Sequence, residues 1–466
     1  MVQLKWQDLG TPRADASDAA TIELAGFMAT PLQAGRTSHF LLVPEASCCA
    51  GCVPRDPQGA IEVFAASPIP VSGRAIRLTG TWTLTRGDAS HWRYQLRDAR
   101  PTEPAGWSSV GRRFVLRGAP LMCLAAVAGA QQQAVAQQRQ ADARQAIGQV
   151  STVDLHSHAG EILRVRYGNT GLAPVAAPMA EGGMAVVCFA IVSDSPCHRL
   201  EADHRIHPYR SPDPGELYAW SQRGFARLHQ LIAQERLAVI TNAAMLQAAR
   251  GGTPSAIVAA EGGDFLDGNA DRVDEAYERW QLRHLQLTHY RVNELGDIQT
   301  EPPEHGGLTD AGAEVIRRCN RRGIVVDVAH GTFDLVKRAA SVTTKPLVLS
   351  HTSLSARPGE RSRLISPAHA RLIAQTGGVI GIWPPRSIFP DLTAMANGMA
   401  RMADVVGVEH VGLGSDMLGL PSGGVFDNYR QLPDLAEAML AVGFSPADVG
   451  KVLGGNYARV FAATMV

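Results

Sequence analysis

Residues 307–330, GLTDAGAEVIRRCNRRGIVVDVAH, contain the pattern that decides the fold. A helix-like segment, Leu308 to Arg322, leads into a short apolar strand, Ile324 to His330, that ends in a histidine. The apolar spacing of the helix indicates that it packs as scaffold. Short apolar runs alternate with helix-like segments in the same way from about residue 151 to the C-terminus. Such alternation is typical of β/α units that build a parallel sheet.

Nine segments of this region are predicted to be strands, one more than an eight-stranded barrel holds. The length of the region, about 316 residues, suits an α/β fold of the (β/α)8 TIM-barrel type with modest insertions. The weakest candidate for a barrel strand is Leu237–Thr241, which is expected to be a short accessory strand. The other candidates are Thr152–His156, Met184–Val192, Ala256–Glu261, His284–His289, Ile324–His330, Leu347–His351, Val379–Trp383 and His410–Asp416.

Histidines and acidic residues follow the ends of several of these strands. In a parallel barrel all strand C-termini open on one face, which holds the active site, so these residues are expected to converge at one mouth. Because residues i and i+2 of a strand point the same way, His156 and His158 can both face that mouth. The strand-end set is His156, Ser157, His158, Glu261, His289, His330, His351 and Asp416.

Several imidazoles and two carboxylates in one mouth predict a metal site. Neutral imidazole is the commonest metal ligand, and buried polar groups without partners are costly. A carboxylate between two groups of imidazoles can bridge two cations about 3.5–4 Å apart, and Glu261 is placed to do so. A single strand-end histidine is more often a packed core residue, but five of them argue against that interpretation. The remaining histidines lack the strand-end context and are expected to be structural or surface residues: His198, His204, His207, His229, His305, His369 and His410.

Seven segments of the region follow one another in a distinctive order. They are AEGGDF, LTHYRVNELGD, GLTDAGAEVIRRCNRRGIVVDVAH, LVLSHTSLSARPG, TGGVIGIWP, EHVGLGSD and VLGGNYARVF. In this order they resemble the membrane (renal) dipeptidase family, whose members are zinc metallopeptidases on an amidohydrolase-like TIM barrel. The resemblance covers residues from about 151 to 466, roughly two thirds of the chain.

The resemblance implies two zinc ions in each chain. His156 and His158 would bind one ion together with Glu261, and Glu261 would bridge to a second ion held by His330 and His351. The family often has His-x-Asp where this chain has a histidine at position 158. That difference replaces an oxygen ligand by a nitrogen ligand, which bears on the metal that the site prefers and on the number of ions it holds.

The resemblance also implies roles in amide hydrolysis, in which a metal-bridging hydroxide attacks the scissile carbonyl. Asp416, at the end of the last strand, is placed to act as general base and acid. His289 matches the family histidine that contacts the substrate and stabilises the tetrahedral oxyanion. Arg363 matches the arginine that holds the free carboxylate of the substrate, although counting forward from His351 leaves Arg361 as an alternative. A carboxylate clamp beside two metals implies a small dipeptide substrate.

Two other function classes stay open. The same metals could hydrolyse a lactam, a lactone or another amide. A protein that kept the fold only for binding is the other class, and the intact ligand set argues against it. Lys+Arg and Asp+Glu are both 44, and this balance argues against a nucleic-acid partner. No apolar run reaches the roughly 18 residues of an integral membrane span. A homo-oligomer is compatible with the sequence.

Residues 1–105 are predicted to form a small β-rich domain. Its apolar runs, Phe40 to Val43 and Ile61 to Phe64, are bounded by Pro and Gly, and Ile76 to Leu84 alternates as a half-buried strand does. The stretch FLLVPEASCCAGCVPRDPQGAIEVF loosely resembles an uncharacterised bacterial domain of small β-barrel type. Three thiols in this stretch could form a metal or redox site, but without a fourth ligand they favour a turn with incidental cysteines: Cys48, Cys49 and Cys52.

Residues 106–150 are predicted to be a linker. GRRFVLR at 111–117, followed by GAPLMCLAAVAGA and a Gln-rich run, resembles a twin-arginine export signal. Val115 departs from that pattern, and the segment lies more than a hundred residues from the start of the chain. The alternatives are an Ala/Gln-rich linker helix, or the signal of an exported ancestor that survives as a linker. The compartment, periplasmic or cytoplasmic, depends on this choice.

Overall fold

The chain forms two compact units, Met1–Ala119 and Pro120–Val466, in a computed structural model. Three sequence features lie outside the residues that the structure describes: the cysteines at 48, 49 and 52, the signal-like segment 111–130, and His204. Of the predicted linker, residues 137–149 form a helix. The described residues are 2–4, 6–9, 11–29, 36–44, 60–70, 76–84, 94–102, 137–163, 172–203, 205–250, 252–355, 358–359, 361–421 and 423–465.

The first unit is β-rich, as predicted. Its strands form one sheet in the order β1-β2-β3-β4-β6-β5, and β2 also pairs with β5, so that five of them close on themselves. Inside, the rings of Trp82 and Tyr94 stack at 5.0 Å, and Nε1 of Trp82 donates to the carbonyl of Ala14 at 2.9 Å. The elements are β1 (Val2–Gln3), η1 (Trp6–Asp8), α1 (Pro12–Asp15), β2 (Thr21–Ala29), β3 (Arg36–Val43), β4 (Ile61–Pro70), β5 (Ile76–Leu84) and β6 (Tyr94–Pro101).

Eight parallel strands of the second unit close into the predicted barrel, in the order β7-β8-β12-β13-β14-β15-β16-β17 and back to β7. The strands are β7 (Val153–Ser157), β8 (Val186–Val192), β12 (Ser255–Glu261), β13 (Leu282–Gln286), β14 (Val325–Asp327), β15 (Val348–Thr352), β16 (Val379–Ile382) and β17 (Val411–Leu413).

The accessory strand was also predicted correctly. β11 (Ala238–Val239) pairs only with the start of β12, at Ser255 and Ala256, and so stays outside the closed ring. Every residue of β8 is buried, as expected for a parallel strand covered on both faces.

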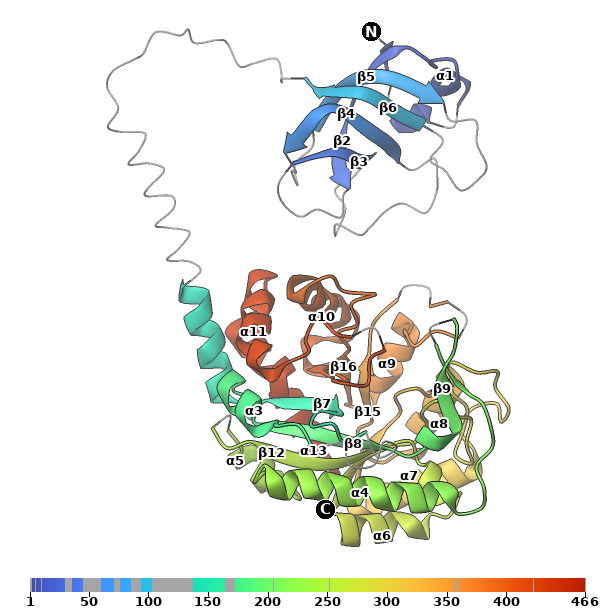
Figure 1. The fold of residues 1–466 in the computed structure, drawn as a ribbon, viewed down its shortest axis with the longest axis vertical. Coiled ribbons are helices and arrows are strands. Elements are labelled where there is room, and N and C mark those ends of the chain that lie inside the picture. The colour runs from blue at the N-terminus through green and yellow to red at the C-terminus, as the bar shows by residue number, and fades with distance from the viewer. Residues whose placement is uncertain are drawn as a thin grey trace. The chain divides into compact units, whose positions relative to one another are not determined.

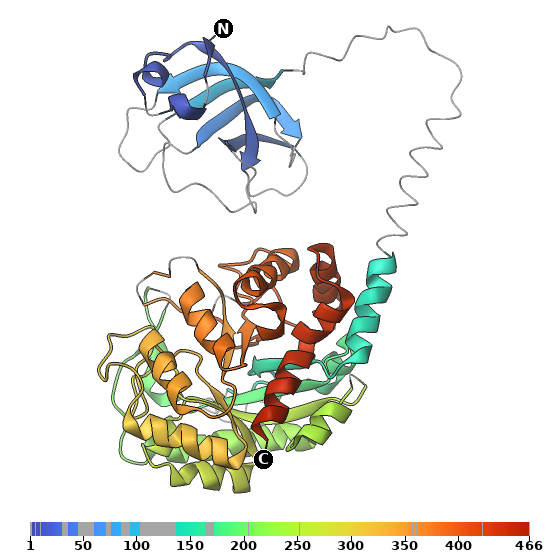
Figure 2. The ribbon, with the colours of Figure 1, turned by 180° about the vertical axis from the view of Figure 1, so that it is seen from behind.

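Helices surround the ring of strands, as Figures 1 and 2 show from opposite sides. No helix that the structure describes combines the length and the apolar character needed to cross a bilayer. The helices are α3 (Ala176–Gly182), α4 (Glu216–Gln234), α5 (Ala243–Ala248), α6 (Asp271–Trp280), α7 (Asp310–Arg322), α8 (Phe333–Val342), α9 (Pro367–Gln375), α10 (Leu392–Val406), α11 (Leu432–Ala441), α12 (Pro446–Gly450) and α13 (Asn456–Thr464), with the shorter turns η3 (Ser195–Cys197), η4 (Asp264–Leu266), η5 (Val408–His410), η6 (Tyr429–Gln431) and η7 (Lys451–Gly455).

Local signals set the ends of these helices. The hydroxyl of Thr309 accepts from the backbone N–H of Gly312 at 3.0 Å and so caps the start of α7. α7 ends at Gly323, whose φ of 74° lies in the left-handed region that glycine adopts without strain. Ser445 caps α12 by accepting from the N–H of Asp448 at 3.1 Å.

Two departures from a plain β/α alternation border the site. β13 and β14 each end three residues before the predicted histidine, so His289 and His330 lie on the loops that follow. Between β8 and α4 the chain forms an antiparallel hairpin of β9 (His198–Leu200) and β10 (Ile206–Pro208). Both features bring loop residues to the carboxyl ends of the barrel strands.

Candidate metal centre

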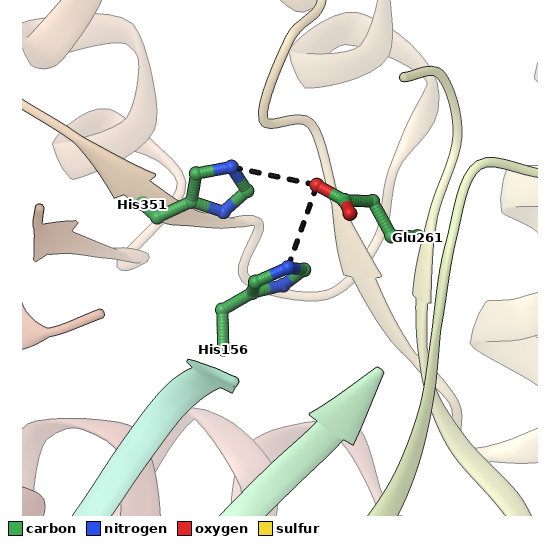
Figure 3. A group of neighbouring side chains, drawn as sticks. All are labelled: His156, Glu261 and His351. Carbon is green, nitrogen blue, oxygen red and sulfur yellow. Dashed lines mark ion pairs between the residues drawn. The ribbon is translucent and has the colours of Figure 1, made fainter. Parts of the chain in front are cut away.

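The carboxylate of Glu261 lies at the centre of five imidazole rings. Glu261 is the last residue of β12 and is 2% exposed. Its Oε1 lies 3.4 Å from Nε2 of His156 and 3.5 Å from Nε2 of His351 (Figure 3). The other Nε2 atoms lie as close to one or other of its oxygens: His158 at 3.2 Å, His289 at 3.3 Å and His330 at 3.3 Å.

The imidazoles also face each other in two pairs. Nε2 of His156 lies 3.2 Å from Nε2 of His158, and Nε2 of His330 lies 3.1 Å from Nε2 of His351. Two nitrogen lone pairs this close repel each other unless a proton or a cation lies near both. The geometry offers three sets of ligand atoms around Glu261: His156–Glu261–His351, His156–His158–Asp416 and Glu261–His289–His330.

A backbone contact fixes which nitrogen of His158 faces the site. Its Nδ1 lies 2.8 Å from the carbonyl oxygen of Ala190, which can only accept, so Nδ1 carries a proton and donates it. In the neutral ring, Nε2 then presents its lone pair to Glu261 and to Oδ1 of Asp416, 3.3 Å away. A metal-binding histidine is held in this way, with its outer nitrogen in a hydrogen bond.

Burial and neighbouring charges shift the pKa values of other groups in the site. Burial lowers the pKa of His330 and of His351 well below the ordinary histidine value, which keeps both rings neutral. Burial alone would raise the pKa of Glu261, but the rings of His289 and His156 hold that pKa well below its ordinary value. His330 and His351 are therefore neutral nitrogen ligands beside an ionised carboxylate.

The raised pKa of His158 indicates that positive charge is favoured at this position, as a metal ion would supply. Burial opposes ionisation of this ring, yet hydrogen bonds with Asp416 and Glu261 raise its pKa to about 10. The two carboxylates thus favour a positive charge at Nε2, and a divalent cation supplies that charge in place of the proton. Imidazole nitrogen and carboxylate oxygen are ligands that zinc accepts. The residues present fit a metal.

Two buried carboxylates behind the site hold the backbone of the strand ends. Asp154 on β7 accepts from the N–H groups of His156 and Ser415, at 3.3 and 2.9 Å. Asp327 on β14 accepts from the N–H groups of Ala329 and Ser350, at 2.9 and 3.0 Å. Each of these bonds is made next to or at a strand-end residue, so the two aspartates fix where those side chains emerge.

Asp416 sits where the sequence predicts, at the mouth beyond β17. Its N–H donates to the carbonyl of His156 at 2.9 Å, and its φ of 47° is a left-handed value that costs a non-glycine residue energy. Gly419 leaves room for its carboxylate, because a Cβ there would lie 2.0 Å from Oδ1 of Asp416. His330 also has a left-handed φ, 66°, so backbone strain gathers at the site.

A second acidic residue, Asp194, completes the environment of His289. Oδ1 of Asp194 accepts from Nδ1 of His289 at 2.7 Å and lies 3.3 Å from Nε2 of His198, while Oδ2 accepts from the N–H of Tyr290 at 3.0 Å. Asp194 is fully buried. Burial opposes a charged His289 ring, but Asp194 and Glu261 raise its pKa above the ordinary value.

His198, which is expected from the sequence to be a structural or surface residue, lines the cleft. Its ring lies at the cleft wall beside Asp194, because the turn η3 reverses the chain after β8 and returns His198 to the mouth. Asp194 was missed altogether, although it follows the apolar run of β8 just as the predicted residues follow their strands. Other histidines are structural as expected: His229, His305 and His410 bond to backbone carbonyls.

The two arginines that the sequence leaves open differ in position. Arg363 is 9% exposed and lines the cleft, whereas Arg361 is exposed and its carbonyl accepts from Arg205. Nη1 of Arg363 donates to the amide oxygen of Gln299 at 2.7 Å, and Nη2 lies 3.5 Å from the carbonyl oxygen of His351. Its buried Nε has no partner among the described residues.

The metal centre opens into a cleft. An inner cavity of about 100 Å³ is lined by His198, Tyr290 and Trp383 together with the predicted site residues other than His156. Towards solvent it is walled by Ile206 of the β9–β10 hairpin and by Leu418. One cleft therefore joins the ligand cluster, the acid Asp416 and the guanidinium Arg363.

Comparison with known sequences shows relatives of one kind. Dipeptidase aclJ of Aspergillus oryzae is 32% identical over 222 residues, which are 45% of this chain and 51% of the relative. Dipeptidase 3 of Mus musculus is 27% identical over 219 residues, 44% of this chain and 43% of the relative. The chain spans about half the length of the curated relatives it matches.

Solved structures share the fold of the barrel unit. The probable dipeptidase PvdM from Pseudomonas aeruginosa superposes with a TM-score of 0.59 at 16% identity, covering 70% of this chain and 98% of that one. A metallopeptidase from Rhodobacter sphaeroides, liganded with a phosphinate mimic of the dipeptide L-Ala-D-Ala, gives 0.59 at 22% identity, with 68% and 99% covered.

The family model of the membrane dipeptidases, peptidase family M19, matches residues 177–465. That span is more than half of the chain, and it contains all but the first two of the predicted metal ligands. It confirms the resemblance that the sequence motifs indicate. The chain belongs to the membrane dipeptidase family.

Proposed function

We propose that this chain is a metal-dependent dipeptidase. The observation that carries the proposal is the cleft that joins the imidazole cluster around Glu261 to the buried guanidinium of Arg363. A hydrolytic centre beside a carboxylate-binding arginine suits a short peptide with a free C-terminus. The Rhodobacter sphaeroides structure, with its bound dipeptide mimic, agrees with this substrate class.

We assign the metal ligands in two sets that share Glu261. Membership in a metallopeptidase family implies a bound metal. His156 and His158 would hold one ion with Glu261, and His330 and His351 would hold the other, in keeping with the two close nitrogen pairs. Zinc suits this set of nitrogen and oxygen ligands. Metal held by these residues would supply Lewis-acid activation of a water molecule near neutral pH.

Asp416 is the proposed general base and acid. Its carboxylate lies at the cleft wall, 3.3 Å from Nε2 of His158, within reach of a proton at the reaction centre. It would take the proton of the nucleophile and return it to the leaving amine. Gly419 leaves the space that this carboxylate occupies, since a Cβ there would lie 2.0 Å from its Oδ1.

His289 and Arg363 are the proposed substrate-binding groups. Asp194 holds His289 by Nδ1, which directs Nε2 into the cavity, where it would stabilise the oxyanion of the attacked carbonyl. Arg363, held at Nη1 by Gln299, would bind the terminal carboxylate. The scissile amide then lies between these two groups.

The test is hydrolysis of a dipeptide panel by protein whose metal content is measured in parallel. We expect turnover that depends on bound divalent metal, together with little hydrolysis of longer peptides. Protein that binds no divalent metal, and cleaves no dipeptide after zinc is added, would refute the proposal. An N-acylated dipeptide amide, which lacks the free carboxylate, is the matched control substrate.

The second candidate is hydrolysis of a lactam, a lactone or another amide by the same metals. The nitrogen ligand at position 158, where the family often has an oxygen ligand, is the observation that favours it. The role of Arg363 separates the two candidates, because only a substrate with a free carboxylate depends on it.

A further inference from the structure

The cleft continues beyond Arg363 into an outer lobe of about 370 Å³. Arg363, Tyr290 and Trp383 line both the inner cavity and this lobe. If Arg363 binds the terminal carboxylate, the scissile amide extends inward from it and the side chain of the C-terminal residue extends outward. The outer lobe is therefore the space that this side chain occupies, an assignment that rests on the proposed function.

The charge of the lobe is positive. Arg205, on the turn of the β9–β10 hairpin, lines it together with Arg363, and its described lining residues include neither aspartate nor glutamate. The guanidinium of Arg205 bonds to the backbone carbonyl of Arg361 and forms no ion pair with a described carboxylate. A guanidinium group is a cation, so one of the two is in excess once the terminal carboxylate is bound.

The walls of the lobe suit a short apolar stem. Leu200, Ile206 and Leu420 line it, and Leu200 is 53% exposed at the mouth. Methylene groups would pack on these side chains while a terminal charge reaches the guanidinium. An acidic amino-acid side chain has this composition.

We propose that the outer lobe binds the carboxylate of an acidic C-terminal residue of the dipeptide, with Arg205 as the group that recognises it. Arg363 then binds the α-carboxylate, and Arg205 binds the side-chain carboxylate. The preferred substrates are dipeptides that end in glutamate or aspartate.

The test compares Ala-Glu with the isosteric Ala-Gln on the metal-loaded enzyme. We expect kcat/KM to favour Ala-Glu by about tenfold or more, the effect of one charge-assisted bond. Arg205→Met should bring this ratio close to one, and Arg205→Lys should restore part of it. Arg361→Met is the matched control, because its side chain does not line the cleft, and it should keep the wild-type ratio. A wild-type ratio near one, or a ratio unchanged in Arg205→Met, would overturn the proposal.

Calorimetry with the free products separates this proposal from the proposed function. If neither dipeptide is cleaved, the dipeptidase proposal fails, yet glutamate should still bind the metal-loaded protein about tenfold more tightly than glutamine. Arg205→Met should abolish that difference. Equal affinity of the wild-type protein for the two amino acids would overturn the acidic subsite.

Discussion

Oδ1 of Asp194 accepts a hydrogen bond from Nδ1 of His289 at 2.7 Å, and the opposite nitrogen of the ring lies 3.3 Å from Glu261. Asp194 thus sets the direction in which His289 faces the cavity. We expect Asp194→Ala to lower kcat by about 10- to 100-fold, the usual effect of losing such a partner. KM and metal content should change little, and Asp194→Asn, which still accepts a hydrogen bond, should recover part of the rate. Loss of bound metal in both variants would show instead that Asp194 supports the metal centre.

Removal of the bridging carboxylate should empty the site. Glu261 is the only acceptor shared by all five imidazoles in the described part of the chain. We expect elemental analysis to give about two divalent ions per wild-type chain and fewer than one in Glu261→Gln. Because a bound metal stabilises the folded state, chelation should also lower the unfolding temperature of the wild-type protein. An unchanged metal content in Glu261→Gln would contradict the bridging assignment.

Asp416→Asn should separate chemistry from metal binding. The substitution removes the proton acceptor while it keeps the size of the side chain beside Gly419. We expect kcat to fall by about 10²- to 10⁴-fold, the contribution of a positioned acid–base group, at unchanged metal content. Steady-state rates and elemental analysis on the same preparation check this. A rate within about twofold of wild type would remove Asp416 from the reaction.

The two neighbouring arginines form a matched pair of variants. Arg363 is buried at the cleft wall and Arg361 is exposed outside it. Arg363→Ala should weaken dipeptide binding by about 10- to 100-fold, as expected for a lost charge-assisted bond, with KM rising more than kcat falls. Arg361→Ala should behave like the wild type. If a substrate without a free carboxylate loses as much activity in Arg363→Ala as a dipeptide does, carboxylate binding is not the role of Arg363.

The alternation of strands and helices was enough to predict the barrel and to mark Leu237–Thr241 as accessory, because a two-residue strand outside the ring leaves a weak apolar run. The strand-end rule also found every histidine around Glu261. The rule identified His289 and His330 although both lie on loops. A loop that follows the carboxyl end of a barrel strand still places its first residues on the same face of the barrel.

The strand-end rule missed one residue, after β8. Asp194 follows that strand, but the conspicuous histidine nearby, His198, returns to the cleft only through the turn η3, which no strand pattern indicates. The orientation of the His158 ring could not be predicted from the sequence either. The bond that directs His158 comes from the carbonyl of Ala190 on the neighbouring strand β8, and it depends on the register between β7 and β8.

The β9–β10 hairpin at the cleft should be tethered in a pH-dependent way. His207 lies between two carboxylates, with Nε2 at 2.9 Å from Asp203 and Nδ1 at 2.9 Å from Glu301. Hydrogen bonds to these two groups raise the pKa of His207 above its ordinary value of 6.5. These two contacts of a protonated His207 are therefore complete below pH 6.5 and are lost as pH rises through the raised pKa.

We expect hydrogen exchange of the hairpin amides, corrected for the intrinsic effect of pH, to become faster across that range. His207→Gln, which cannot ionise, should exchange fast at every pH, and the buried amides of β8 should stay protected throughout. Hairpin protection that is constant from about pH 6 to about pH 9 in the wild type would show that charge on His207 does not hold the hairpin.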